Sequence, residues 1–514
     1  MRNLTISKTI PLLLFLSFFL CGCSIHGLTN SNVGSSSLEV GEKPKTIRDI
    51  NTSNGDFSMP SIGESHLLVI PVMLTDFASN ATEANRKNIE KAFSGSSDET
   101  SWESVASFYE KSSYGKFHLS VTVSNWFDCG YSSSEIASFT DKSSSLFDPT
   151  WRIAQESMEW YKSTYQTNGQ ELDADKDGLI DGLFLVYSAP NYKKKPSLNH
   201  DVYWAYTYSL YDSKERNIKS PTPYRYSWAS YDFVYAGYGS SGVDAHTYIH
   251  EAGHLLGLGD YYVSKTDDSI KANYSPVGGV DMMDANIIDH NSFSKLALGW
   301  IEPTVCLSSG AFSLKPYESS GDCLLIPTDS GWNGTPFDEY MLLEFYTPDG
   351  LNEKDSLSAY PGNFHKVKGF STKGIRIFHV DARMTAISIS ASAHYVNSVS
   401  QSSNISTFLA HNNSSAYNLL NPEYRLIQLM DKAGKRNFDM DNDRKSSNAS
   451  VSSMAYADSS CLFTEGDSFS LLDYKDSFPN YRYHSKIEMN NHSTFSKKVT
   501  ITSLDQENAT ISVS

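Results

Sequence analysis

The segment His250-Glu-Ala-Gly-His-Leu-Leu-Gly-Leu-Gly-Asp260 carries the strongest chemical signal in this sequence. Its two histidines are four residues apart, so on a helix their imidazoles lie on one face, one turn apart, where they can share a metal ion. Glu251 is rotated from His250 by about 100° around the helix, so its carboxylate can reach a water on the metal without binding the metal itself. The pattern predicts a zinc site in which Glu251 is the general base.

A catalytic zinc ion usually has three protein ligands, so the sequence must supply one more than the two histidines. One arrangement takes a Glu from a later helix, but the chain has no Glu between Glu251 and Glu302. In the other arrangement the helix ends at a glycine and the chain turns back to offer a ligand three residues later. Gly257 and Asp260 occupy these two positions. Asp260 is therefore the predicted third ligand beside His250 and His254, and His290 is the alternative.

An amphipathic helix with incidental histidines is the competing interpretation of this segment. A chain of this size and composition would contain the five-residue His-Glu-x-x-His pattern by chance on the order of one time in fifty. Requiring Gly257 and Asp260 as well lowers that chance to roughly one in ten thousand, which favours a metal site. His246, one turn before the first ligand, is expected outside the ligand set, on the surface or behind a ligand. Tyr261 and Tyr262 lie near in sequence, but no oxyanion stabiliser can be assigned from sequence alone.

A methionine follows the predicted zinc helix in the segment Gly278-Gly-Val-Asp-Met-Met283. The distance suits a tight turn beneath the metal, where a Met side chain would form an apolar floor under the imidazoles. Ordinary core packing explains a single Met equally well. Only its place after the zinc helix favours Met283 for this role.

A run of alternating acidic residues matches the first part of a calcium loop. Gly178 stands at position 6, where the loop needs a sharp turn, but position 12, where a bidentate Glu is expected, is Phe184. The alternative is an acidic surface turn. The acids at positions 1, 3, 5 and 9, which are the predicted calcium ligands, are Asp173, Asp175, Asp177 and Asp181.

The amino terminus has the pattern of a bacterial export signal. Arg2 and Lys8 precede an apolar run from Ile10 to Leu20, which is too short to span a bilayer comfortably but suits a signal's hydrophobic core. The run ends in Leu-Cys-Gly-Cys23, which resembles the bacterial lipoprotein signal. We therefore expect residues 1–22 to be removed and Cys23 to carry lipid, with a plain cleaved signal as the alternative. The protein would then be exported and anchored at the cell surface, or secreted if Cys23 is not lipidated.

Composition excludes several other classes of protein. The chain has 514 residues, 39% of them hydrophobic, which is enough for about two to four packed domains. The formal net charge is −17 and no cluster of Lys and Arg stands out, so a nucleic-acid partner is not expected. The lipid anchor is the only membrane contact that we expect, and the protein should be a monomer. Of the later cysteines, Cys306 and Cys323 could form a disulfide, but free thiols are equally compatible with the sequence: the four are Cys129, Cys306, Cys323 and Cys461.

The expected organisation is an α+β protein in four segments. After the signal, residues 23–60 are rich in Ser, Asn and Gly and are predicted to be a flexible tether. Residues 61–304 are predicted to form the catalytic domain and residues 305–514 a β-rich C-terminal domain. Strands are expected at 66–77, 117–123 and 183–187, with Pro71 favouring a sheet edge or a bulge, and helices at 104–111 and 151–165. Later strands are expected at 323–327, 340–346, 374–380, 424–430 and 499–514, with a long polar loop at 385–415.

At the zinc motif the sequence resembles the immune inhibitor A-like family of bacterial secreted metallopeptidases, whose helix reads His-Glu-x-x-His-x-x-Gly-x-x-Asp. The resemblance covers about residues 66–480 and is strongest around this motif. One departure is Gly259, where the family usually has Pro before the Asp. The other segments that carry the resemblance are 69–77, Tyr109-Glu-Lys-Ser-Ser-Tyr-Gly-Lys116, Asp281-Met-Met283, 293–301, 340–344 and 374–381.

The resemblance implies a metzincin-like zinc protease domain followed by a β-rich region, and a structural calcium ion in the acidic run. The expected activity is that of an exported zinc metalloendopeptidase, which hydrolyses peptide bonds of extracellular proteins by a zinc-activated water. The alternative from another class is a catalytically silent, surface-anchored binding or adhesion lipoprotein on a zincin scaffold. Such a protein should have lost the base or a metal ligand. This sequence keeps all four of these residues, which are His250, Glu251, His254 and Asp260. An amidase or another zinc hydrolase would use the same metal chemistry on a different substrate.

Overall fold

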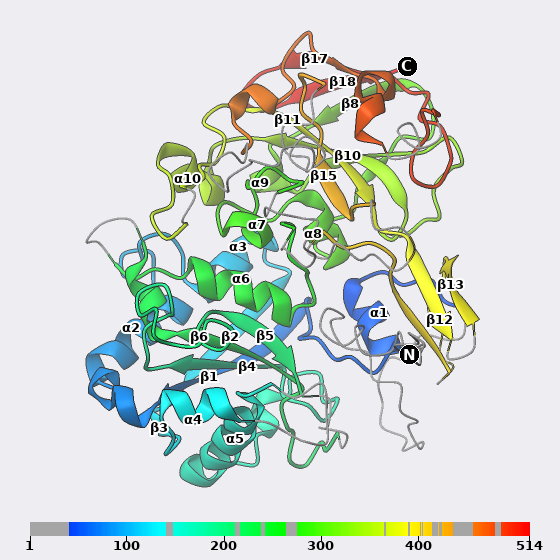
Figure 1. Cartoon of the computed structure of the whole chain (residues 1–514). Coiled ribbons are helices and arrows are strands. Elements are labelled where there is room, and N and C mark those ends of the chain that lie inside the picture. Colours follow the sequence, from blue (N-terminus) through cyan, green and yellow to red (C-terminus); the bar gives the residue numbers. More distant parts are fainter. Residues whose placement is uncertain are drawn as a thin grey trace, which may run out of the picture.

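The computed structural model describes residues 41–139, 148–210, 216–237, 242–263, 275–363, 366–388, 391–400, 402, 404–413, 420, 424–434, 456–478 and 485–514. These residues form a mixed α and β protein with several sheets (Figure 1). None of their helices is long and apolar enough to cross a membrane. The predicted signal at 1–22, the lipidation site Cys23 and the first part of the predicted tether lie outside the described residues.

The first sheet has the strand order β2-β1-β4-β6-β5, with β3 also paired to β1. All its strands run parallel except β5, which is antiparallel to β6. Every residue of β4 and β6 is buried, as expected of parallel strands with both faces covered. The predicted strands at 66–77, 117–123 and 183–187 are confirmed in outline. The bounds are β1 Gly63–Met73, β2 Phe117–Val123, β3 Phe127–Asp128, β4 Gly182–Tyr187, β5 Tyr206–Ser209 and β6 Arg225–Ser230.

Helices cover both faces of this sheet (Figure 1). On one face, α2 (Glu83–Ser94), α3 (Val105–Ser112) and α6 (His246–Leu255) share a hydrophobic core with alternate residues of β1 and β4. On the other face, α4 (Ser133–Ser138) and α5 (Trp151–Tyr165) pack against the remaining residues of these strands. The two helices predicted at 104–111 and 151–165 are confirmed.

Pro71 lies in a central strand, so the expectation of a sheet edge or a bulge is wrong. The partner on that side of β1 is interrupted: β2 pairs as far as Val69 and β3 begins at Val72. The carbonyls of Val69 and Met73 accept hydrogen bonds from this side, so the nitrogen of Pro71 faces the interruption. Its missing N–H therefore removes no ladder hydrogen bond.

The second half of the chain is built around a five-stranded sheet with the order β15-β11-β10-β9-β7 and a four-stranded sheet with the order β16-β17-β18-β8. The predicted strands at 323–327, 340–346 and 374–380 are confirmed, and 499–514 folds as an antiparallel pair. The segment 424–430 contributes only its last part. The bounds are β7 Thr304–Val305, β8 Gly310–Leu314, β9 Cys323–Pro327, β10 Glu339–Tyr346, β11 Gly374–Asp381, β15 Ile427–Leu429, β16 Ser468–Phe469, β17 Val499–Leu504 and β18 Ala509–Val513.

Short helices connect these parts, and one hydrophobic core continues across the predicted boundary at residue 304. That core contains Ile249 of α6 as well as Leu342 of β10. Helix α6 is therefore packed by both halves of the chain. The short α-helices are α7 Met282–Ala285, α8 Ser292–Ala297, α9 Tyr317–Ser320 and α10 Glu353–Leu357.

The predicted long loop at 385–415 is wrong over about half of its length. It contains β12 (Met384–Ser388), β13 (Ala391–Val396) and β14 (Ile405–Leu409), which form an antiparallel sheet in the order β13-β12-β14. The polar residues of this segment suggested a loop. In the paired strands, some of their side chains form hydrogen bonds with neighbouring strands. The hydroxyl of Thr385, for example, is buried and donates to the carbonyl of His394 at 3.0 Å.

The predicted tether is also wrong from residue 41 to residue 60. This segment contains α1 (Ile47–Ser53), which begins with a capping box formed by Thr46 and Asp49. Ile47 and Ile50, three residues apart, point into the main core, and Met59 follows them there. The segment has few apolar residues, but their helical spacing puts them on one face, which composition alone does not reveal.

Candidate metal centre

Three predicted metal ligands converge at the C-terminal end of α6. Oδ1 of Asp260 lies 3.1 Å from Nε2 of His250 and 3.2 Å from Nε2 of His254. Ligand atoms about 2.0–2.1 Å from a tetrahedral zinc ion lie roughly 3.3 Å from one another. The spacing of these three atoms therefore fits one ion held between them. They form one of two possible metal-ligand groups among the described residues.

His290, the alternative third ligand, is not part of this group. Its ring is buried among Phe108, Tyr109 and Trp300, and neither ring nitrogen has a hydrogen-bond partner among the described residues. Burial lowers the pKa of His290 well below its usual value, so the ring is neutral. The structure brings Asp260, and not His290, to the two histidines.

Backbone carbonyls orient both imidazoles. Nδ1 of His250 lies 2.8 Å from the carbonyl oxygen of Met282, and Nδ1 of His254 lies 2.8 Å from that of Leu258. A carbonyl only accepts hydrogen bonds, so each Nδ1 carries the proton and each Nε2 faces Asp260. This is the tautomer that a metal-binding histidine requires.

The turn that carries Asp260 depends on one glycine. Gly257 has a φ of +102°, and a Cβ atom there would lie 2.8 Å from Nδ2 of Asn51. Gly259 has no such restriction, since the nearest atom to its Cβ position is Nδ2 of Asn412 at 3.8 Å. Asp260 reaches the histidines although Gly259 stands where Pro is usual.

Without a metal ion, the ligand group holds a proton. Burial alone would lower the pKa of His254, but the Asp260 carboxylate raises it to about 9. Burial alone would raise the pKa of Asp260, but the two imidazoles hold it well below its usual range. A metal ion must therefore displace this proton, as metal binding to histidine generally does.

Glu251 lies beside the ligand group and is buried within α6. Its Oε2 accepts a hydrogen bond of 3.1 Å from the hydroxyl of Thr207 on β5. Burial raises the pKa of Glu251, an effect that the neighbouring histidines oppose. A buried carboxylate with a raised pKa beside a metal-ligand group is typical of a general base.

The segment after α6 packs against that helix. The side chain of Asp281 accepts hydrogen bonds from the backbone N–H of Met283 and of Asn291, which fixes the turn into α7. Met283 lies against Gly253 of α6, and its carbonyl oxygen accepts a hydrogen bond from the N–H of Tyr261. The turn therefore contacts both the zinc helix and the loop of the third ligand.

The two tyrosines after Asp260 have different surroundings. The hydroxyl of Tyr261 is 2.7 Å from that of Ser294, whereas the Tyr262 phenol is under the electrostatic influence of the Asp260 and Glu251 carboxylates. Burial and the nearby carboxylates raise the pKa of Tyr262 well above its usual value. Tyr262 is therefore a protonated phenol near these carboxylates, a feature that the sequence left open.

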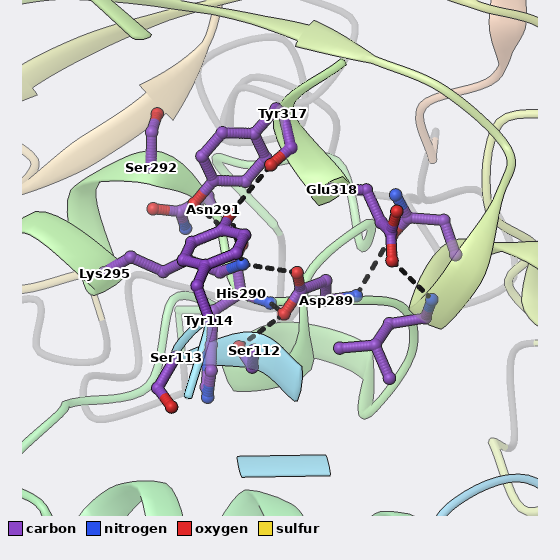
Figure 2. A network of polar contacts seen from close by, with 12 residues as sticks. Ser112, Ser113, Tyr114, Asp289, His290, Asn291, Ser292, Lys295, Tyr317 and Glu318 are labelled. Atoms are coloured by element: carbon purple, nitrogen blue, oxygen red, sulfur yellow. Dashed lines mark hydrogen bonds and ion pairs between the residues drawn. The ribbon is translucent and has the colours of Figure 1, made fainter. Parts of the chain in front are cut away.

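A buried polar network around Asp289 and Lys295 lies near α6 (Figure 2). Sequence reasoning did not identify its residues. The ammonium group of Lys295 is buried 2.5 Å from Oδ2 of Asp289 and 2.8 Å from the Tyr114 hydroxyl. Oδ1 of Asp289 accepts a hydrogen bond from Ser112. Tyr109, on the same helix as Ser112, donates its hydroxyl proton to the carbonyl of Ile249 in the zinc helix at 2.7 Å. The only sequence signal for this network was the family resemblance of the segment Tyr109 to Lys116. No spacing rule predicts the contacts that this segment makes.

The acidic run forms the second possible metal group, but only in part. Oxygen atoms of Asp173, Asp175 and Asp177 lie within 4.8 Å of one another. Asp181 is not part of this group, and its carboxylate accepts hydrogen bonds from the backbone N–H groups of His66 and Ala174.

An arginine also lies at the acidic run. The guanidinium of Arg48 on α1 is 2.6 Å from Asp175 and 3.8 Å from Asp177. This internal cation offsets part of the negative charge that would attract calcium.

His246 and the cysteines lie outside both groups. His246 is buried between the rings of Trp102 and Tyr360, with Nδ1 2.7 Å from Asp244, so it is neither a ligand nor a surface residue. The four described cysteines are buried free thiols, so no disulfide joins Cys306 to Cys323.

No family model matches this chain, and no curated protein matches it either. The geometry around His250, His254 and Asp260 is thus the observation on which a function can be proposed.

Proposed function

We propose that this chain is a zinc-dependent metalloendopeptidase with a metzincin-like catalytic domain, which hydrolyses peptide bonds of proteins outside the cell. The observation that carries the proposal is the convergence of His250, His254 and Asp260 with the buried base Glu251 beside them. The sequence resemblance to the immune inhibitor A-like family supports the same activity.

The donor set fits zinc better than calcium or magnesium. Two imidazole nitrogens and one carboxylate oxygen are ligands that zinc accepts, whereas calcium and magnesium prefer oxygen atoms only. Three protein ligands also leave one coordination position open, as catalytic zinc sites do. Zinc bound there would polarise the substrate carbonyl and lower the pKa of water in the open position.

The chain's own residues supply the proton transfers. Glu251, held by the Thr207 hydroxyl, takes a proton from the attacking water and delivers it to the leaving amine. Its burial raises its pKa toward neutrality, which suits a group that must both accept and release a proton. Tyr262 is the hydroxyl donor that we assign to the charge developing on the carbonyl oxygen.

An extended peptide is the substrate that the neighbouring strand favours. Thr207 belongs to β5, which is the last strand of its sheet among the described residues and the only antiparallel one there. The backbone of such a strand can pair with an extended peptide, and this pairing would hold a substrate beside Glu251.

Export through an N-terminal lipid at Cys23 completes the proposal. Mass spectrometry of the mature N-terminus tests it. A lipid mass on Cys23 supports anchoring, whereas an unmodified terminus beyond Cys23 would make the enzyme freely secreted.

The decisive experiment compares the full-length protein with Glu251→Gln. The variant should keep its zinc but lose about 100- to 10,000-fold of its activity on casein, since it retains the ligands and lacks the base. Glu110→Gln, which removes an exposed carboxylate from α3, should leave activity unchanged. Near-normal proteolysis by Glu251→Gln would refute the assigned base. A zinc-loaded parent that cleaves no peptide in a broad proteome digest would favour the silent adhesion lipoprotein instead.

A further inference from the structure

The C-terminal end of the zinc helix is held by groups from outside the helix. The last carbonyls of a helix lack partners within it and need others. The carbonyl oxygen of Leu255 accepts a hydrogen bond of 2.8 Å from the backbone N–H of Met59. The carbonyl oxygen of His254 accepts one of 3.0 Å from Nη1 of Arg225, in addition to one from Gly257 within the turn. The second metal ligand is therefore fixed by its own backbone.

Arg225 reaches His254 as part of a buried ion pair. Its Nε lies 3.2 Å from Oδ1 of Asp56, and its Nη2 lies 2.5 Å from Oδ2. Both side chains are almost fully buried, with 6% and 3% exposure. The two carboxylate contacts fix the plane of the guanidinium, which leaves Nη1 pointing at the His254 carbonyl.

The same N-terminal segment also lies against the turn that carries Asp260. Asn51 and Ile47 of α1 are the nearest neighbours of the Cβ position at Gly257. On its other side, α1 is tied to β14, because the side chain of Asn54 accepts a hydrogen bond of 2.8 Å from the N–H of Thr407 and donates one to its carbonyl. The turn is thus packed against an anchored helix.

Asn413, four residues after β14, also contacts the segment that carries Asp260. Its Nδ2 donates to the carbonyl of Tyr261 at 3.1 Å and to that of Ile427 at 2.7 Å. The residue that follows Asp260 is therefore tied to the five-stranded sheet. The ligand turn lies between α1 and this segment.

We infer that residues 47–59, here called the N-terminal brace, position the metal centre. The principal positioning residues are Asp56 of the brace and its ion-pair partner Arg225 on β6. The inference rests on the proposed zinc site. Asp56 acts through Arg225 on the backbone of His254, and α1 acts on Gly257. The composition of this segment suggests a tether. In the folded protein it instead supports the metal centre.

Zinc affinity of the full-length protein tests this role, measured by competition with a chromophoric chelator. Asp56→Asn should weaken zinc binding about 10- to 100-fold, the effect typical of residues that orient metal ligands. Arg225→Lys keeps a cation beside Asp56 but cannot hold both carboxylate oxygens and the His254 carbonyl in one plane. It should weaken zinc binding in the same direction and by less.

The matched control is another buried bidentate pair. Arg383 contacts Oδ1 of Asp381 at 2.7 Å and Oδ2 at 2.9 Å, and the other side chains at this carboxylate among the described residues are His411 and Asn490, neither of which belongs to α6. Asp381→Asn should lower the stability of the fold yet leave zinc affinity unchanged.

Each outcome bears on a different claim. Folded Arg225→Lys that binds zinc as tightly as the parent overturns the brace, even if Asp56→Asn does not fold. Equal losses of zinc affinity in Asp56→Asn and Asp381→Asn also overturn it, because the effect is then general destabilisation. A parent protein that binds no zinc overturns the proposed metal centre, and the brace with it.

Discussion

The sulfur atom of Met283 lies 2.5 Å from the position that a Cβ atom on Gly253 would occupy. Gly253 stands between the two histidine ligands on α6, and the Tyr109 hydroxyl is 3.3 Å from the same position. Only a hydrogen atom fits there. The absence of a side chain at Gly253 lets Met283 pack directly against α6.

Gly253→Ala should therefore displace the zinc helix from Met283. Inserting a methyl group into a packed core typically costs about 1–3 kcal/mol. Urea unfolding of the zinc-free protein measures this loss, and zinc affinity should fall with it. Gly259→Ala is the matched control, because nothing lies within ordinary contact distance of its Cβ position except Asn412 at 3.8 Å. Equal losses in the two variants would contradict the packing described here.

Asp260→Ala should weaken zinc binding by more than about 100-fold, because it removes a ligand and not merely an orienting group. His290→Ala should leave zinc affinity close to that of the parent, since the His290 ring lies outside the ligand group. Its effect should be on stability, through the cavity it opens among aromatic rings. Isothermal titration with zinc distinguishes the two variants; the reverse order of affinities would exchange the roles of Asp260 and His290.

Calcium should stabilise the protein through Asp173, Asp175 and Asp177. At a calcium concentration of about one hundred times the dissociation constant, binding to the folded form alone adds about 2.7 kcal/mol, or several degrees in Tm. Asp177→Ala should abolish this shift while zinc stays bound. Asp181→Asn should keep it, because Asp181 accepts backbone hydrogen bonds outside the group.

Thermal melts at fixed zinc and varied calcium measure this response. If the parent and Asp177→Ala respond alike, the acidic run is a surface turn. In that case Arg48 and Arg216 are the cations that lie beside Asp175 and Asp177.

Raising the pH above about 9 should destabilise the fold through His246. Burial alone would lower the pKa of this imidazole, but Asp244 and Asp355 raise it to about 9. A folded pKa above the unfolded value of about 6.5 means that the stabilisation is complete below pH 6.5 and is lost as the pH passes 9. The shift corresponds to roughly 3 kcal/mol. The Tyr360 hydroxyl bonded to Asp244 does not titrate in this range, since burial raises its pKa well above the usual value.

Urea unfolding at about pH 6 and about pH 10 checks this effect. The parent should lose stability between the two values, and His246→Gln, which cannot carry the charge, should lose much less. A parent with equal stability at both values would show that His246 is neutral in the folded protein.

The local chemistry of the metal centre could be predicted from the sequence, because it depends on short spacings. The separation of four residues between His250 and His254 places both on one helical face whatever surrounds them. The order Gly257 to Asp260 needs only a turn to return the carboxylate to that face. The buried strand β4 could be predicted for a similar reason, since a continuous apolar run has few alternatives inside a fold.

Contacts between distant segments could be decided only by the tertiary structure. The composition of residues 41–60 is that of a solvated linker, and its burial depends on Arg225, on Gly257 and on a sheet formed more than 300 residues later. Likewise, no spacing rule could show that Asp181 leaves the acidic group or that Lys295 lies buried against Asp289. The sequence by itself determined which side chains could meet as a candidate metal-ligand group, because that follows from local geometry. What holds those atoms in place was decided by packing between residues far apart in the chain, because side-chain partners and burial exist only once the chain has folded.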